Sequence, residues 1–281
     1  MRRGIAAAIG MRIDTVELPR GRLRPISIEP GPGPLADGLH GGVIRAAERF
    51  GKRLALEVCQ PPGHGSTAAS GRRWLVIEPR MTGLLLVAEP PTVEHVRLRL
   101  SGHGPGRRRQ ELIFWDRRGL GTLRLVDAGG LERLCGPERL GPDALTITAD
   151  ELAARLKGSQ RAVKVALLDQ RAVAGVGNLY AAEILFGAGI SPRARCSQLS
   201  RPRWNRLQAV MKEVLEEAVE LEGSTLSDAT YRTALNEPGR YQSRHQVYGR
   251  EGQACPSCGT AIRRIVQAQR STFYCPQCQA R

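Results

Sequence analysis

Cys255-Pro-Ser-Cys258 and Cys275-Pro-Gln-Cys278 are the stretches that decide how the end of this chain folds. Sixteen residues separate the two C-x2-C pairs, a spacing typical of four thiolates that bind one zinc ion tetrahedrally. A shell of four cysteines leaves no open position for water, so we expect this Zn²⁺ to stabilise the fold and to do no chemistry. The residues between the pairs include 269–274, Gln-Arg-Ser-Thr-Phe-Tyr, which predict a hairpin with a basic and aromatic tip.

The charge of the chain points to a polyanionic partner. Its 281 residues carry 42 Lys and Arg against 27 Asp and Glu, a net charge of +15. Only four of the 42 are lysines, which indicates a compositional bias toward arginine. Such a bias exchanges one cation for the other but does not create a surplus over the acids. We therefore favour nucleic acid as the partner, ahead of a membrane surface.

Composition also bears on the compartment. No run approaches eighteen apolar residues, so the sequence predicts no membrane span. The short apolar run after Met1 is followed too soon by charges to be a signal peptide. The three cysteines outside the zinc pattern, Cys59, Cys135 and Cys196, are scattered singly and predict no disulfide framework. A reducing cytoplasm is therefore expected.

The pattern of apolar residues changes once along the chain. Residues 1–9 look like the end of a helix that stops at Gly10, and strands then dominate to about residue 130. Short runs separated by Gly and Pro predict a β-sandwich or barrel, with strands at 13–18, 53–58, 74–77, 83–87, 95–100 and 122–126. From residue 142 to about 235 the pattern predicts helices, including an acidic start at 149–152 and an amphipathic run over 204–221. Residues 236–250 are expected to be a flexible polar linker.

Gly175-Val-Gly177-Asn178 is a tight glycine turn that leads directly into a predicted helix. A turn of this kind can present backbone N–H groups and a helix N-terminus to a phosphate. A Gly-x-Gly pattern alone is weak evidence, and without further context Asn178 is better explained as a simple N-cap.

Taken together, these residues resemble the formamidopyrimidine-DNA glycosylases and their endonuclease VIII relatives. The resemblance runs from residue 2 to residue 279, and the glycine turn with the zinc hairpin is its most specific part. The matching stretches are Arg2-Arg-Gly-Ile, Arg49-Phe-Gly-Lys52, Met81-Thr-Gly, Asp116-Arg-Arg-Gly-Leu-Gly121, Leu140-Gly-Pro-Asp-Ala-Leu, residues 169–183, Ala188-Gly-Ile-Ser-Pro, Val247-Tyr-Gly-Arg-Glu-Gly, the four cysteines and residues 269–274.

The resemblance implies an α+β fold in three parts: an N-terminal β-sandwich catalytic domain (1–135), a helix–two-turn–helix DNA-binding domain (140–236) and a β-hairpin zinc finger (245–281). It implies a base-excision-repair enzyme that removes oxidised purines, such as 8-oxoguanine and formamidopyrimidine, from double-stranded DNA. The same enzyme would cleave the strand at the abasic site. It would hold one structural Zn²⁺ and act as a monomer in the bacterial cytoplasm, associated with the nucleoid.

The resemblance also assigns residues. An enzyme that extrudes a nucleotide must fill the gap it leaves, and the filling residues match Met81, Arg118 and Leu120. An apolar wedge replaces the lost stacking, and a guanidinium bonds the orphaned cytosine. Leu120 stands where the family more often has phenylalanine, so we expect a slimmer wedge. Without the resemblance, Met81 and Leu120 would be read as ordinary core.

Three further positions match family residues at the reacting centre. Lys52 matches a lysine that contacts phosphate and assists elimination; the alternative is a solvated turn lysine. Unlike a guanidinium, a desolvated ammonium can give up a proton. Asn178 and Arg270 match the pair that holds the phosphates beside the lesion, and Arg270 is also implicated in elimination. The alternative for Arg270 is an arginine that merely faces solvent.

One departure concerns the nucleophile. In the family an N-terminal proline attacks the sugar, and the following glutamate helps to open its ring. This sequence begins Met1-Arg-Arg-Gly-Ile, about two turns further along the first helix, which is about 10 Å from the required point.

We therefore expect that the start is placed at an internal methionine and that an in-frame Pro-Glu pair lies upstream. The alternative is a non-catalytic protein that binds lesions or abasic sites. A third hypothesis, a zinc-ribbon protein that binds RNA or ribosomes, predicts no preference for damaged duplex.

Overall fold

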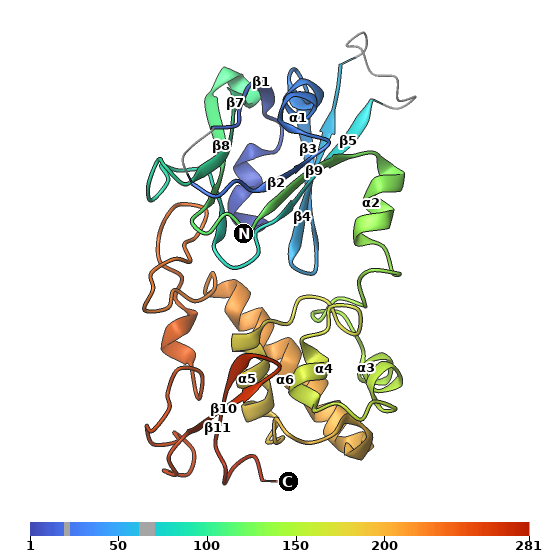
Figure 1. The fold of residues 1–281 in the computed structure, drawn as a ribbon, viewed down its shortest axis with the longest axis vertical. Coiled ribbons are helices and arrows are strands. Elements are labelled where there is room, and N and C mark those ends of the chain that lie inside the picture. The colour runs from blue at the N-terminus through green and yellow to red at the C-terminus, as the bar shows by residue number, and fades with distance from the viewer. Residues whose placement is uncertain (20–22, 62–70, 281) are drawn as a thin grey trace. The chain divides into compact units, whose positions relative to one another are not determined.

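The computed structural model describes residues 1–19, 23–61 and 71–280. These residues form two compact units (Figure 1), and the chain contributes to each unit twice. The first unit contains Met1–Gly136 and Ser224–Arg240, and the second contains Pro137–Gly223 and Tyr241–Arg281.

The first unit is built on strands that hydrogen-bond in the order β2-β9-β5-β4-β3-β1-β7-β8-β6. The strands are β1 (Arg12–Glu17), β2 (Ser27–Glu29), β3 (Val43–Phe50), β4 (Arg53–Cys59), β5 (Arg72–Glu78), β6 (Gly83–Leu86), β7 (Val96–His103), β8 (Arg109–Asp116) and β9 (Thr122–Val126).

The sheet folds over into the predicted sandwich at the join between β1 and β3. Arg12↔Val43 is the register pair between these strands, whereas β1 pairs with β7 over most of its length (Figure 1). One hydrophobic core therefore receives side chains from both layers, for example Leu56 and Leu75 from one and Leu100 and Phe114 from the other. The α+β fold class is confirmed.

Helices close the ends of this core. The chain starts with a 3-10 helix, η1 (Arg3–Ala8), whose Ile5 and Ala8 are buried; the helical stretch ends as predicted, before Gly10 with φ +90°. Helix α1 (Pro32–Leu39) buries Leu35 and Leu39, and α2 (Ala128–Cys135) follows β9. A one-turn 3-10 helix, η2 (Pro105–Arg107), joins β7 to β8.

The second unit is helical and carries the zinc hairpin. Its elements are α3 (Ala149–Leu156), α4 (Val163–Leu167), α5 (Asn178–Gly187), η3 (Cys196–Gln198), α6 (Arg201–Glu220), η4 (Tyr241–Arg244), β10 (Arg263–Gln267) and β11 (Arg270–Tyr274). The predicted acidic start at 149–152 is confirmed, since Thr148 and Glu151 form a capping box at α3. The amphipathic run predicted over 204–221 is also helical, but α6 begins three residues earlier, at Arg201; it buries Trp204, Leu207 and Met211.

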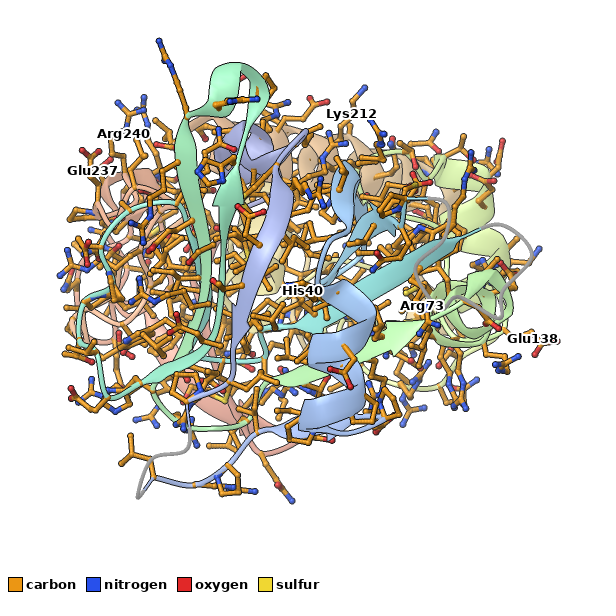
Figure 2. All side chains as sticks on the ribbon, turned by 90° about the horizontal axis from the view of Figure 1, so that it is seen from above. His40, Arg73, Glu138, Lys212, Glu237 and Arg240 are labelled. Carbon is orange, nitrogen blue, oxygen red and sulfur yellow. The ribbon has the colours of Figure 1, made fainter. Side chains whose placement is uncertain are left out.

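The segment Ser224–Arg240 packs in the first unit although it follows α6. Val87 N–H donates to Ala234 O at 2.9 Å, and Ala234 lies in the first unit's core. Thr225 ties the two ends of the segment together, since its hydroxyl donates to Tyr231 O at 2.7 Å and accepts from Gly239 N–H at 2.9 Å. The charged side chains of Glu237 and Arg240, labelled in Figure 2, are exposed on this segment.

The helices of the described residues are unsuited to a bilayer. Over residues 1–19, 23–61 and 71–280, no helix is both long enough and apolar enough to cross one.

Candidate DNA-binding and zinc sites

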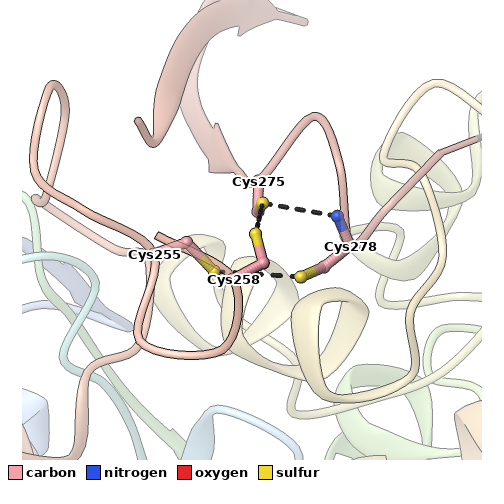
Figure 3. A group of neighbouring side chains, drawn as sticks. All are labelled: Cys255, Cys258, Cys275 and Cys278. Atoms are coloured by element: carbon pink, nitrogen blue, oxygen red, sulfur yellow. Dashed lines mark hydrogen bonds between the residues drawn. The ribbon is translucent and has the colours of Figure 1, made fainter. Parts of the chain in front are cut away.

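The four predicted cysteine ligands meet at the base of the β10–β11 hairpin (Figure 3). Their Sγ atoms all lie within 4.8 Å of one another, with Cys258 and Cys275 3.5 Å apart and Cys255 and Cys278 3.9 Å apart. A tetrahedral zinc with Zn–S bonds of about 2.3 Å requires sulfur–sulfur separations of about 3.8 Å. The donor set and its spacing therefore fit one structural Zn²⁺.

The finger is docked onto the loop that follows α5 in its own unit. Gln279 Nε2 donates to Ile190 O at 2.9 Å, and Gln267 Nε2 donates to Pro192 O at 3.1 Å. At the hairpin tip, Ala268 and Gln269 both have positive φ, 47° and 60°, as a two-residue type I′ hairpin turn requires. This turn puts Arg270, which is exposed, at the first position of β11.

The expectation of a flexible linker over 236–250 is wrong for its second half. The buried carboxylate of Glu183 on α5 accepts the backbone N–H groups of Gln246 (2.8 Å), Val247 (3.1 Å) and Tyr248 (2.7 Å). Burial raises the pKa of Glu183, and the three N–H donors oppose this shift. The polar composition of residues 236–250 could not predict this ordering, because the carboxylate that fixes it belongs to a residue more than sixty positions earlier.

A ladder of aromatic rings runs along the same connection. Successive centroids are 5.1 to 6.0 Å apart, in the order Tyr180, Tyr241, His245, Tyr248 and Phe273. The ladder joins the first turn of α5 to β11 of the finger. Tyr241 is 2% exposed, and burial raises the pKa of its phenol well above the ordinary tyrosine value.

Asn178 lies where α5 meets the finger. It is the first residue of the helix, and Gly177 is the N-cap, so the N-cap interpretation is wrong. Its side chain bridges two partners instead: Nδ2 donates to Ser271 O at 3.0 Å, and Oδ1 accepts from Lys164 Nζ at 2.5 Å. Asn178 thus holds the strand that begins with Arg270 against the N-terminus of α5.

Lys164 is a residue of this site that the sequence analysis did not assign. It lies on α4, is fully buried, and also contacts Ser271 O at 3.4 Å. Burial and the nearby charge of Arg270 lower its pKa to about 8. The sequence offered one indication of its importance: Lys164 is one of only four lysines in an arginine-rich chain.

Together these residues form a cationic cluster of the second unit, defined by Lys164, Asn178, Arg270 and the start of α5. Two positive side chains beside a helix N-terminus, which carries a partial positive charge, suit a phosphate. Asn178 and Arg270 were predicted as a pair, and the structure places Asn178 against the residue that follows Arg270. Their role in binding phosphate stays a prediction.

In the first unit, two adjacent loops carry the predicted gap-filling residues. Met81 lies before β6 and is 72% exposed, so the ordinary-core alternative is wrong for it. Arg118 and Leu120 lie between β8 and β9; Arg118 is exposed and Leu120 is half-buried. Arg118 Nη1 donates to Met81 Sδ at 3.2 Å.

Lys52 lies in the tight turn between β3 and β4. The preceding Gly51 has φ +57°, and Arg49 Nη1 donates to Gly51 O at 2.9 Å. This geometry exposes the Lys52 side chain at the turn that joins two neighbouring strands of the sheet. Its catalytic role stays a prediction.

A β-sandwich unit and a helical unit with a docked zinc finger define a class of DNA-repair glycosylase. Family models match nearly the whole chain: the formamidopyrimidine-DNA glycosylase N-terminal domain over residues 1–123, the H2TH domain of the same glycosylase over 139–230, and the zinc finger found in FPG and IleRS over 252–281. The chain belongs to the formamidopyrimidine-DNA glycosylase family. It is therefore a DNA glycosylase of base excision repair with a structural zinc finger.

Individual relatives agree with this assignment. The formamidopyrimidine-DNA glycosylase of Thermus thermophilus is 40% identical over 273 residues, covering 94% of this chain and 96% of its own. The Chloroflexus aurantiacus glycosylase is 39% identical over 260 residues, covering 91% and 86%.

Solved structures show the same fold. Lactococcus lactis Fpg in complex with DNA that contains an abasic site superposes with a TM-score of 0.83 at 28% identity, covering 100% of this chain and 97% of that one. The MutM (Fpg) protein of Thermus thermophilus gives a TM-score of 0.80 at 36% identity, covering 99% and 95%.

Proposed function

We propose that this glycosylase excises oxidised purines from duplex DNA and then cleaves the strand at the abasic site. The observation that carries the proposal is the exposed pair of Met81 and Arg118, which are in contact on neighbouring loops. An exposed thioether beside a guanidinium suits a gap in stacked bases, because one part replaces stacking and the other donates to an unpaired base edge.

The substrate class rests on the relatives. Solved structures similar to this chain include a mutant of Lactococcus lactis Fpg with DNA that contains Fapy-dG, and MutM with DNA that contains carbocyclic 8-oxo-G. We propose the same lesions for this chain, acting as a monomer on the DNA of a bacterial nucleoid. The division into 1–135, 140–236 and 245–281 is proposed as its functional organisation, with residues 224–236 packing in the first unit.

The cationic cluster supplies the phosphate grip in this proposal. Asn178 and Arg270 hold the phosphates beside the lesion, and the N-terminus of α5 adds its partial positive charge. Lys164 keeps Asn178 oriented through the bond to Oδ1. Lys52 is proposed to contact phosphate and to assist elimination, with Arg270 acting in the same later step.

Bond cleavage at C1′ needs a nucleophile. In the proposed mechanism a secondary amine attacks C1′ and displaces the damaged base, a carboxylate assists opening of the sugar ring, and an iminium ion results. Residues 1–10 contain neither proline nor glutamate, and residues 3–8 are held in η1. A second candidate is a protein that binds lesions or abasic sites without cutting.

Borohydride trapping separates the two candidates. We expect the 281-residue chain to bind duplex with a tetrahydrofuran abasic analogue in preference to undamaged duplex, yet to give no trapped adduct with true abasic DNA. A version preceded in frame by a Pro-Glu leader is expected to be trapped, because it supplies the secondary amine. A trapped adduct of the 281-residue chain would overturn the assignment of the nucleophile, and no preference for the analogue would overturn the proposed function.

A further inference from the structure

A buried pair of side chains, Thr82 and Asp116, joins the two loops that carry Met81, Arg118 and Leu120. Thr82 is 7% exposed and Asp116 is fully buried. The Thr82 hydroxyl donates to Asp116 Oδ1 at 2.5 Å. Thr82 lies on the loop before β6, and Asp116 is the last residue of β8, where it pairs with Gly83 at the start of β6.

Asp116 organises the second of these loops. Its Oδ2 accepts the backbone N–H groups of Leu120 at 2.8 Å and Gly121 at 2.7 Å, and its Oδ1 accepts that of Arg118 at 3.3 Å. The backbone of Asp116 is itself fixed, because its N–H donates to His95 O and its carbonyl accepts from Arg97 Nε. The Thr82 hydroxyl and these three N–H groups are all donors, so a carboxylate satisfies them and an amide does not.

Thr82 links the loops through both functions of its hydroxyl. The same Oγ1 that donates to Asp116 accepts the backbone N–H of Arg118 at 3.1 Å. The residue that follows Met81 therefore holds the main chain of Arg118 directly. A displacement of Thr82 would move the thioether and the guanidinium relative to each other.

We propose that Thr82 and Asp116 are positioning residues that set the preference of this glycosylase for the base opposite the lesion. The inference rests on the proposed gap-filling function of Met81 and Arg118. Arg118 can only donate, so it suits the O2 and N3 acceptors of an orphaned cytosine and meets a donor on the N6 amine of adenine. Arg118 can discriminate between the two bases only if its guanidinium is held in a fixed position. A guanidinium free to move by about 1 Å could find an acceptor on either base.

The matched pair Thr82→Val and Thr82→Ser tests the inference. Valine keeps the shape of threonine and removes both hydrogen bonds, whereas serine keeps the hydroxyl. The measurement is the affinity of each full-length variant for duplex with a tetrahydrofuran site opposite cytosine or opposite adenine, with undamaged duplex as reference. A 2-aminopurine beside the site reports insertion of the wedge through its fluorescence.

We expect Thr82→Val to lower the cytosine-to-adenine affinity ratio by about tenfold, within the range of one good arginine–base contact. Thr82→Ser should retain the wild-type ratio to within about twofold, because its hydroxyl still donates one hydrogen bond and accepts another. Affinity for undamaged duplex and its salt slope should not change in either variant, since neither touches the cationic cluster. Asp116→Asn should lower the ratio in the same direction as Thr82→Val.

Equal ratios for Thr82→Val and wild type would overturn the inference. A parallel loss in Thr82→Ser would also overturn it, since that result would assign the effect to packing. Failure of the proposed function looks different: wild-type protein would then show no preference for the tetrahydrofuran duplex, and Arg118→Ala would change nothing.

Discussion

At the scale of single residues, the candidate site contains polar groups whose partners are distant in sequence. Lys164 illustrates this, because its ammonium is buried against Asn178 and the backbone of Ser271, 107 positions away. A buried cation beside Arg270 is electrostatically unfavourable, and its pKa is lowered to about 8. A bound DNA phosphate would offset this repulsion between the two cations.

Lys164→Met should therefore remove a pH dependence of DNA binding. In wild type, affinity for a tetrahydrofuran duplex should fall as the pH rises from about 7 to about 9, because Lys164 loses its proton through about 8 in the free protein. The variant should bind more weakly at neutral pH and show a flatter profile. Fluorescence anisotropy at constant ionic strength measures both, and Lys157→Met, at an exposed lysine, is the control.

The lowered pKa of Lys164 also predicts how the free energy of unfolding changes with pH. The folded-state pKa of Lys164 lies below its ordinary value of 10.5, so the folded state binds fewer protons between about 8 and 10.5. Through Lys164 alone, the free energy of unfolding rises with pH over that window and is lowest below it. Parallel pH profiles for wild type and Lys164→Met would contradict this account.

At the scale of elements, the sequence predicts regular patterns well and mixed ones poorly. β4, β5, β7 and β9 were all predicted, because their apolar runs are bounded by Gly and Pro. β3 was missed since Val43–Phe50 contains Ala-Ala-Glu-Arg, which favours a helix, and pairing with β4 overrides that preference. α1 was missed because Pro and Gly make up half of its eight residues.

The residues of the candidate sites were likewise predictable only in part. Cysteine spacing predicted the zinc ligands because a metal imposes its geometry on the sequence. The supports of the site, such as Asp116, Thr82 and Glu183, had no such signature. Each is a single polar residue that binds backbone N–H groups, and the fold alone brings the partners of Thr82 and Glu183 close.

Glu183→Gln tests how the connection to the finger is anchored. The amide offers one acceptor in place of two, so backbone N–H donors of residues 246–248 lose a partner. Loss of a bond to a charged group costs about 2 kcal/mol, which corresponds to about thirtyfold faster local opening. Hydrogen exchange of peptides over 241–250 measures it, with Glu213→Gln on the exposed face of α6 as control. Unchanged exchange would show that the aromatic ladder suffices.

At the scale of the whole molecule, each unit has a core of its own. The finger adds a small cluster around Val247, Cys255, Ile262 and Cys275. So small a cluster cannot hold a fold without its metal, and most of the finger's stability should come from the thiolate bonds.

Removal of zinc should therefore unfold the finger and leave the sandwich intact. Cys258→Ala is expected to lose its metal, to raise hydrogen exchange over β10 and β11, and to lose DNA affinity with Arg270 displaced. Exchange over β4 and β5 should stay at its wild-type level. Cys59→Ala, at a thiol outside the cluster, should keep one zinc per chain by elemental analysis. Retained β11 protection in metal-free Cys258→Ala would argue that docking alone holds the finger.

The return of Ser224–Arg240 to the first unit limits how this gene can be divided. A fragment that stops at residue 136 would leave the amide of Val87 without its acceptor and would uncover the patch beneath Ala234. A fragment that starts at residue 137 would carry an orphaned loop with nothing to pack on. Expression of the sandwich by itself therefore calls for a circularly rearranged or co-expressed design, in which the late segment is supplied along with the early one.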